Sequence, residues 1–360
     1  MINRKNLSQV LSACFCLALF FSVSSTVSSA QAATKPAAKP APTAATTPAV
    51  PFTMEKPPDW ILSQAGECDT LTLFLRSPTE PLLQLFFFPR FGPVYMTQEQ
   101  KTNDLQFEVM SGQKMSRLDM PVVDPLTPEN FARFLPQVLQ MKTVREFLPE
   151  RPKVRVVEPI TTVSQKKTLD YQDSQTAILR VLFVQDNRLG EALIALTTVP
   201  SPEFRNAPGG GIGMGYMLYG LAAPKGELSA QLPTLLAAGR SFKLGPEYEK
   251  KCRKDRAEDL PTLLPDGQSL KAVLDTMALV WEKRSPAEDM LTEKKADSLR
   301  GVERLYRPAT GDVYEFPLGF IASYLAQPAS YNLSDLRPLP DEPALWLKIP
   351  LNGSQAVTKK

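Results

Sequence analysis

The sequence predicts an α+β fold in which an antiparallel β-sheet carries flanking helices and is followed by a smaller helix-plus-hairpin region. Two observations lead to this prediction. From residue 52 to about residue 252, strand runs rich in β-branched, aromatic and leucine residues alternate with helix signals. Beyond residue 252, apolar residues recur at helical spacing instead, and one further hairpin follows.

The predicted sheet is built from strands between residues 70 and 223. Asp186-Asn187-Arg188-Leu189-Gly190 connects two of these strands and is typical of a hairpin turn. Thr127 and Pro128 supply the N-cap and first-turn proline of a helix, which Pro136 is expected to kink. The predicted strands are 70–76, 82–88, 154–163, 177–184, 192–199 and 216–223.

The end of this segment carries a family resemblance. The run YMLYGLAAPKGELSAQLPTLLAAGRSFKL passes from a strand through an Ala-Pro turn into a helix that contains Leu232-Pro233. It resembles the closing unit of Mog1/PsbP-like domains, and the strands before it match such domains in their order. The resemblance implies an antiparallel sheet covered by helices over residues 52–250, and no binding residue is carried over from it. Because members of one fold differ in function, it implies no activity.

After Cys252 the pattern changes to helices and a hairpin. Leu270 to Trp281 contain an apolar stripe at helical spacing, and Ser285 to Glu288 form a capping box that begins a second helix. Gly301 is expected to end that helix. The segment GVERLYRPATGDVYEFPLGF then predicts a hairpin around residues 308–312. It resembles hairpins of exported bacterial proteins, a resemblance that names no activity.

The N-terminus predicts export. Arg4 and Lys5 precede an apolar run over residues 10–23, and Ala30-Gln31-Ala32 is a typical cleavage pattern. Residues 1–32 are therefore expected to be a secretory signal peptide, which places the mature protein in the periplasm, at the cell surface or outside the cell. Two alternatives stay open, a retained membrane anchor and lipidation at Cys14, where Leu11-Ser12-Ala13-Cys14 matches a bacterial lipobox.

The remaining chain divides by composition. Residues 33–51 contain almost only Ala, Pro, Thr and Lys, and therefore predict an extended linker that cannot bury a core. We assign residues 52–252 to the α+β domain, 253–350 to the helical and hairpin region, and 351–360 to a polar tail. No segment after the signal is long and apolar enough to predict a transmembrane helix.

The four cysteines divide across the predicted cleavage site. Cys14 and Cys16 lie inside the signal peptide, whereas Cys68 and Cys252 lie in the mature chain. One pair of cysteines in an exported protein predicts a disulfide, and two free thiols are the alternative. The bond between Cys68 and Cys252 would join the two ends of the α+β domain.

Composition excludes several functions. The chain has no histidine, so it lacks the residue that Ser-His-Asp catalysis, Cys-His catalysis and His-ligated zinc require. Removal of the signal, which holds Arg4 and Lys5 and no acid, leaves 39 basic residues against 38 acidic ones. A nearly neutral chain with interspersed charges predicts no nucleic-acid binding. We predict no cofactor and no metal site.

A glycine-rich loop is the most conspicuous candidate ligand site. Glycine backbone can present N–H groups to an anion, but this loop precedes a strand and lacks the following helix that a dinucleotide fingerprint needs. A flexible connection is the alternative interpretation. The glycines of this loop are Gly209, Gly210, Gly211, Gly213 and Gly215.

Other residues suggest hydrolytic chemistry only weakly. Ser111 with Lys114, and Ser164 with Lys167, fit the S-x-x-K pattern but lack its partner motifs. The adjacent acids Glu258-Asp259 and Glu288-Asp289 favour caps or solvated charges over a glycosidase pair. Trp60, Trp281 and Trp346 stand singly, and core packing is expected for the first two.

The leading hypothesis is an exported, non-enzymatic binding, assembly or envelope-accessory protein whose partner is a cell-envelope protein or a ligand. The alternative is a histidine-free hydrolase that uses carboxylates or a serine–lysine pair.

Overall fold

The computed structural model describes residues 51–115, 117–147, 150–165, 174–201, 211–254 and 267–360. Residues from 49 onward belong to one folded unit by their internal contacts. The predicted signal peptide and nearly all of the predicted linker lie outside the described residues. Among the helices of the described part, none is long and apolar enough to cross a bilayer.

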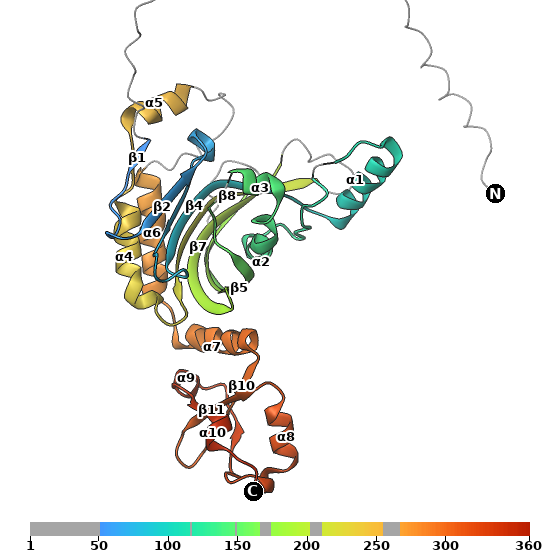
Figure 1. Cartoon of the computed structure of the whole chain (residues 1–360), viewed down its shortest axis with the longest axis vertical. Helices are drawn as coiled ribbons and strands as arrows, with labels where there is room; N and C mark the ends of the chain where they lie inside the picture. The colour runs from blue at the N-terminus through green and yellow to red at the C-terminus, as the bar shows by residue number, and fades with distance from the viewer. Residues whose placement is uncertain (1–50, 116, 148–149, 166–173, 202–210, 255–266) are drawn as a thin grey trace, which may run out of the picture. The chain divides into compact units, whose positions relative to one another are not determined.

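A seven-stranded sheet forms the centre of the fold (Figure 1). Its order is β2-β3-β4-β8-β7-β6-β5, and every neighbouring pair is antiparallel. The predicted α+β class with an antiparallel sheet is therefore confirmed. The strands are β2 (Ile61–Ala65), β3 (Thr72–Arg76), β4 (Gln84–Tyr95), β5 (Val154–Gln165), β6 (Gln175–Gln185), β7 (Arg188–Pro200) and β8 (Ile212–Pro224).

Turn and bulge residues explain where the strands differ from their predicted ranges. Asp186 and Asn187 have φ angles of 50° and 60° and connect β6 to β7 as a two-residue hairpin. The predicted hairpin is confirmed, but its turn is shorter than the predicted residues 186–190, because Arg188 to Gly190 already pair with β6. Strand β4 continues well beyond residue 88, where the sequence contains Gly92 and Pro93 and suggests a strand end. A register shift between Phe91 and Val94 accommodates these two residues, so pairing with β8 continues past them.

Helices cover both faces of the sheet (Figure 1). On one face, α2 (Pro128–Val138) and α3 (Lys142–Phe147) enclose a core that includes Phe131 and Leu135. The Thr127 hydroxyl accepts the backbone N–H of Asn130 at 3.2 Å, which confirms the predicted N-cap of α2.

The opposite face is covered by α4 (Leu228–Arg240) and α6 (Gly267–Glu282), which enclose a second core. Helix α6 lies beyond the predicted domain end at residue 252, yet its buried Leu274 and Met277 belong to this core. The predicted boundary must therefore be corrected, because α6 needs α4 and the sheet to bury its apolar stripe. Nearby, β1 (Phe52–Thr53) pairs with β9 (Lys243–Leu244).

The two edges of the large sheet are protected against further pairing. Strand β2 is only five residues long. Strand β5 contains three register shifts against β6 and carries Pro159, and α2 packs along it. Short, bulged and proline-containing edges prevent a foreign strand from continuing the ladder.

The C-terminal part begins with α7 (Pro286–Arg300). Its predicted capping box is confirmed, since the Ser285 hydroxyl accepts the Glu288 N–H at 3.3 Å and the Glu288 carboxylate accepts the Ser285 N–H at 2.7 Å. Gly301 ends the helix with a φ of 69°, as predicted. A four-stranded sheet of order β12-β10-β11-β13 follows, with its own small core. The remaining elements are β10 (Val302–Tyr306), β11 (Val313–Pro317), α8 (Phe320–Ala326), β12 (Arg337–Pro338), α9 (Pro343–Trp346), β13 (Leu351–Asn352) and α10 (Gly353–Ala356).

The last ten residues are part of this C-terminal sheet and core, and they do not form the expected polar tail. Leu351 pairs in parallel with Tyr314, and Val357 is buried in the small core. Gly353 lies so close to Phe316 that a Cβ on it would be 2.3 Å from the ring. The apolar residues that anchor this segment are too widely spaced to show a helical or strand period in the sequence.

Candidate functional site

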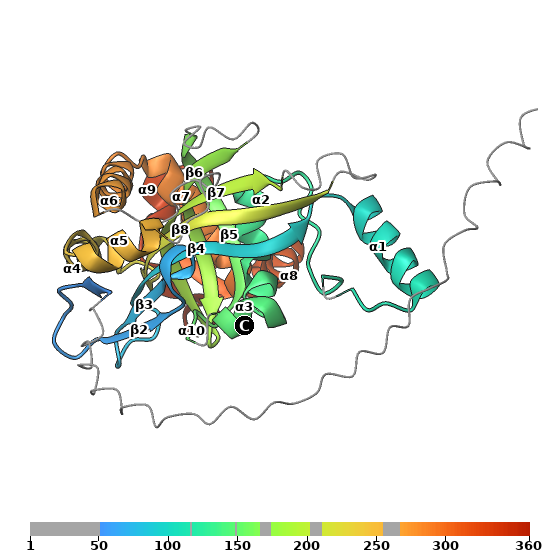
Figure 2. The ribbon, with the colours of Figure 1, turned by 90° about the horizontal axis from the view of Figure 1, so that it is seen from above.

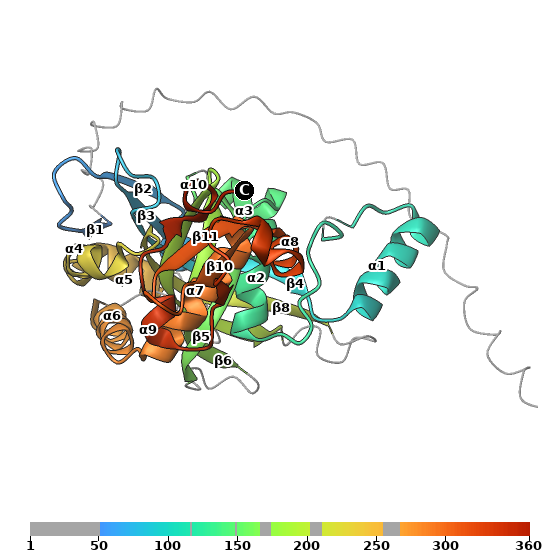
Figure 3. The same cartoon turned by 90° about the horizontal axis from the view of Figure 1, so that it is seen from below.

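Helix α1 (Gln98–Ser111) is the candidate site. It follows β4 and extends away from the sheet in all three views (Figures 1, 2 and 3). The Thr97 hydroxyl accepts the Gln100 backbone N–H at 3.2 Å and caps the N-terminus. Gly112 ends the helix in the left-handed conformation, with a φ of 70°. Local residues therefore set both ends of α1.

The distribution of polar and apolar residues on α1 is the reverse of that in an ordinary surface helix. Its two buried side chains, Gln100 and Asp104, are polar. Its large apolar side chains are exposed, and they surround the last two turns instead of sharing one face. Exposed apolar groups gathered on one element are typical of interaction sites. Their exposed fractions are 51% for Leu105, 46% for Phe107, 77% for Val109 and 79% for Met110.

A buried polar cluster around Asp104 fixes α1 to the end of β4. The Asp104 carboxylate accepts hydrogen bonds from the Tyr95 hydroxyl at 2.8 Å and from the Gln100 amide at 2.9 Å. Arg117 donates to both carboxylate oxygens, from Nε at 2.5 Å and from a terminal nitrogen at 3.0 Å. Such bidentate pairs fix geometry as well as adding energy, so α1 is held in one orientation.

The protonation states of this cluster agree with its hydrogen bonds. Burial acts to raise the pKa of Asp104, but the hydrogen bonds from Arg117 and Tyr95 outweigh it and hold that pKa below its usual value. Burial and the hydrogen bond to Asp104 raise the pKa of Tyr95 well above its ordinary value. At neutral pH the aspartate is therefore charged, and the tyrosine keeps the proton that it donates.

The glycine-rich candidate loop is only partly described. Gly209 and Gly210 lie outside the described residues, and Gly211 has a φ of 84° at the start of β8. Gly213 and Gly215 lie within β8, where a Cβ would be 2.5 Å from Leu126 and 2.4 Å from Phe91. Close packing therefore explains glycine at these two positions without a ligand.

Cys68 and Cys252 lie at bonding distance. The sulfur atoms of Cys68 and Cys252 are 2.09 Å apart across a sequence separation of 184 residues. The bond joins a 3₁₀ turn (Cys68–Thr70) to α5 (Pro246–Lys254). The Cys68 backbone N–H also donates to the Tyr248 hydroxyl at 2.8 Å. As predicted, the bond connects segments at the two ends of the strand-rich part of the chain.

The hydrolytic candidates are only partly within the described residues. Ser111 is the last residue of α1 and accepts the Gln113 backbone N–H, and Lys114 is exposed. Ser164 lies on β5, whereas Lys167 and the pair Glu258-Asp259 fall outside the described residues. In the described part of the chain, no three His, Cys, Asp or Glu residues gather as metal ligands would.

The acids of α7 form ion pairs that join it to the large sheet. Asp289 contacts Arg180 of β6 at 2.6 Å, and Arg180 also contacts Glu191 of β7 at 2.6 Å. The Arg180 guanidinium lies 4.9 Å from the ring centre of Trp281, which is buried as predicted. Glu288, the other acid of the predicted pair, caps the helix. These groups therefore have structural partners.

A second ion-pair cluster joins α7 to the C-terminal hairpin. Arg304 of β10 donates to Glu293 at 3.0 Å, to Asp297 at 2.8 Å and to the Trp346 carbonyl at 2.9 Å. Burial raises the pKa of Asp297 despite Arg304. Burial also acts on Glu293, but Lys225 and Arg304 outweigh it and lower its pKa. Each carboxylate contacts two cations, Lys225 and Arg304 at Glu293, and Arg300 and Arg304 at Asp297. The two pKa values shift in opposite directions because Asp297 is the more deeply buried of the two.

Sequence patterns did not identify α1. Thr97 and Gly112 are typical cap residues, and they are the signal that could have located the helix. Its apolar residues show no helical period, because they are not arranged to face a core. Comparison with known proteins adds no further assignment, since no protein-family model and no curated protein matches this sequence.

Proposed function

We propose that this protein is an exported, non-enzymatic binding or assembly protein of the cell envelope, and that α1 holds its partner. The observation that carries the proposal is the exposure of Phe107, Val109 and Met110 on a helix whose buried side chains are polar. Burying such side chains in a partner's apolar groove is a common mode of helix recognition. The partner is therefore a protein with a groove wide enough for the end of one helix.

The anchoring of α1 supports this proposal. A docking helix that is already held in its binding orientation loses less conformational freedom when it binds. The bonds from Arg117 and Tyr95 to Asp104 provide such a constraint. Docking by strand addition has less support, because the edge strand β5 is bulged and contains Pro159.

Export and family resemblance are parts of the same proposal. The pattern of residues 1–32 supports a signal peptide. The cysteine pair at bonding distance supports an oxidising compartment such as the periplasm or the cell exterior. The antiparallel sheet with helices on both faces supports a Mog1/PsbP-like domain, although fold alone implies no activity.

Site-specific photocrosslinking in the producing cells tests the docking role. A photoreactive amino acid at Met110 is expected to form one crosslinked product of defined size. The matched control is Leu279 on α6, which is 51% exposed and lies away from α1. The double variant F107S/M110S, without a crosslinker at either position, should lower partner co-purification about tenfold or more, since truncating a central apolar anchor weakens binding by more than about 1 kcal/mol.

Two outcomes would contradict the proposal. If crosslinkers at residues 110 and 279 gave the same products in equal yield, or if residue 110 gave none, α1 would not be a docking element. Hydrolysis by the purified chain that a single carboxylate substitution abolishes would overturn the non-enzymatic part and favour the histidine-free hydrolase.

A further inference from the structure

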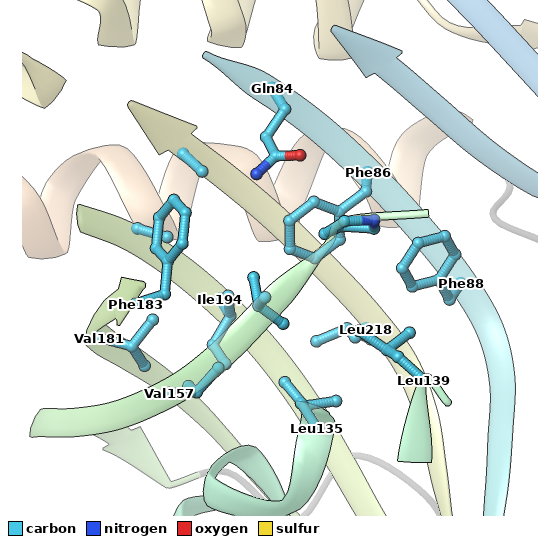
Figure 4. Close-up of a pocket in the computed structure, with 14 residues that line it drawn as sticks. Gln84, Phe86, Phe88, Leu135, Leu139, Val157, Val181, Phe183, Ile194 and Leu218 are labelled. Carbon is cyan, nitrogen blue, oxygen red and sulfur yellow. The ribbon is translucent and has the colours of Figure 1, made fainter. Parts of the chain in front are cut away.

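A small cavity lies between α2 and the sheet, inside the core on that face (Figure 4). Its volume is about 30 Å³. Strands β4 to β8 and α2 all contribute to its lining, which is apolar except for one amide side chain. Figure 4 shows Phe86, Leu135 and Ile194 around it, with the amide of Gln84 at the end nearest to Phe86 and Phe183.

Gln84 is the unusual member of this lining. Its side chain is 1% exposed, and within the described residues its Oε1 atom has no hydrogen-bond partner. Its Nε2 atom reaches Gln185 Oε1 only at 3.5 Å. Burying an acceptor without a partner is unfavourable. The contact with Gln185 accounts for the amide nitrogen of Gln84 and leaves its oxygen without a partner among the described residues.

The chemistry of the cavity defines what would complete it. A buried water molecule typically makes about three hydrogen bonds, and this lining offers one polar side chain. An apolar molecule without a donor would leave Gln84 Oε1 unpaired. A hydroxyl group on an aliphatic carbon satisfies both requirements, since its O–H donates to Gln84 and its carbon contacts the apolar walls.

We propose that this cavity binds the hydroxymethyl end of an aliphatic alcohol, with Gln84 Oε1 as the acceptor. This site is independent of the docking role of α1. An apolar cavity of about 150 Å³ holds benzene, so about 30 Å³ admits a group of one or two heavy atoms. The chain of a longer alcohol would leave between α2 and β5 past the half-buried Val154, which also lines the cavity.

Methyl NMR of the mature chain tests the proposal with ethanol as the probe. Ethanol is expected to shift the methyl signals of Val157, Ile194 and Leu218 in a saturable way. Leu235, buried in the core on the opposite face, is the internal control and should not follow this curve. Fluoroethane has the same heavy-atom skeleton without the donor, and it should bind about fivefold more weakly because one hydrogen bond is missing.

Two substitutions distinguish a hydrogen bond to Gln84 from simple occupation of the cavity. Q84M removes the acceptor while retaining the shape, so ethanol should lose its advantage over fluoroethane. A222V adds carbon atoms to the cavity wall and should abolish the saturable shifts for both probes. The proposal would be overturned if the methyl shifts rose linearly with ethanol concentration and were as large at Leu235 as at the cavity residues. It would also be overturned if Q84M still bound ethanol more tightly than fluoroethane. The comparison of the two probes on the unchanged protein decides it even if a variant fails to fold.

Discussion

Phe91 of β4 and Gly215 of β8 are cross-strand partners, and the phenylalanine ring occupies the space that a side chain at residue 215 would need. Phe86 and Gly220 have the same relationship on the same pair of strands, with a Cβ on the glycine placed 2.0 Å from the ring. Gly190 faces Phe183 in this way between β6 and β7. Glycine in these strands therefore makes room for an aromatic ring on the neighbouring strand.

This packing predicts the effect of G215A. The added methyl group would overlap the Phe91 ring, so we expect the free energy of unfolding to fall by about 1–3 kcal/mol in urea denaturation. Adding F91L should recover part of the loss, because the smaller side chain can move aside. If G215A leaves stability unchanged, close packing does not explain the glycine, and the predicted ligand loop regains support.

Asp104 should make stability depend on pH in the acidic range. Its pKa is lower in the folded protein than its ordinary value, so the unfolded chain binds its proton first as the pH falls. The stabilisation provided by ionised Asp104 is complete at pH values above its pKa in the unfolded chain, about 4. It is lost as the pH falls through the lower pKa that Asp104 has in the folded protein.

The variant D104N should be less stable at pH 7 by about 1–3 kcal/mol and should lack this part of the acid dependence. Urea denaturation between about pH 2 and 7 measures both effects. E108Q is the matched control on the same helix, because it makes the same change of carboxylate to amide outside the cluster around Asp104. Parallel pH curves for D104N and the unchanged protein would contradict the assignment.

Arg180 is expected to stabilise the fold mainly by neutralising the buried carboxylate of Glu191. R180L leaves that carboxylate without its cation, and the expected loss is about 3–5 kcal/mol of unfolding free energy. R180L/E191L removes both charges and should recover much of the stability. A double-mutant cycle measured by urea denaturation provides the coupling, and additive single effects would show that the two residues act independently.

The bond between Cys68 and Cys252 should be the largest covalent contribution to stability. The chain-entropy model assigns about 5 kcal/mol to closing a loop of this length in the unfolded chain. C68S/C252S should therefore lower the unfolding free energy by up to about this amount, and reduction of the unchanged protein should have the same effect. In the denatured protein, Cys68 and Cys252 should not react with an alkylating agent until the protein is reduced. Alkylation of both cysteines without reductant would refute the bond.

Much of the strand and turn structure is predictable because its causes are local. The hairpin at Asp186-Asn187 needs two residues that tolerate positive φ, and both are adjacent in the sequence. The N-cap at Thr127 and the capping box at Ser285 likewise act over three residues. The candidate site was less predictable, because the exposure of Met110 depends on what lies beside α1 and not on its own residues.

The sequence by itself determined the class of the fold, most of its strands, the turn between β6 and β7, and the pair of cysteines available for a bond. Tertiary structure alone decided that α6 belongs to the core of the sheet, that the last residues complete the C-terminal sheet, and that α1 exposes its apolar side chains. Local propensity acts between residues close in the chain, whereas burial depends on partners that arrive from distant segments. Asp104 and Arg117, or Arg180 and Asp289, become neighbours only when those segments pack together.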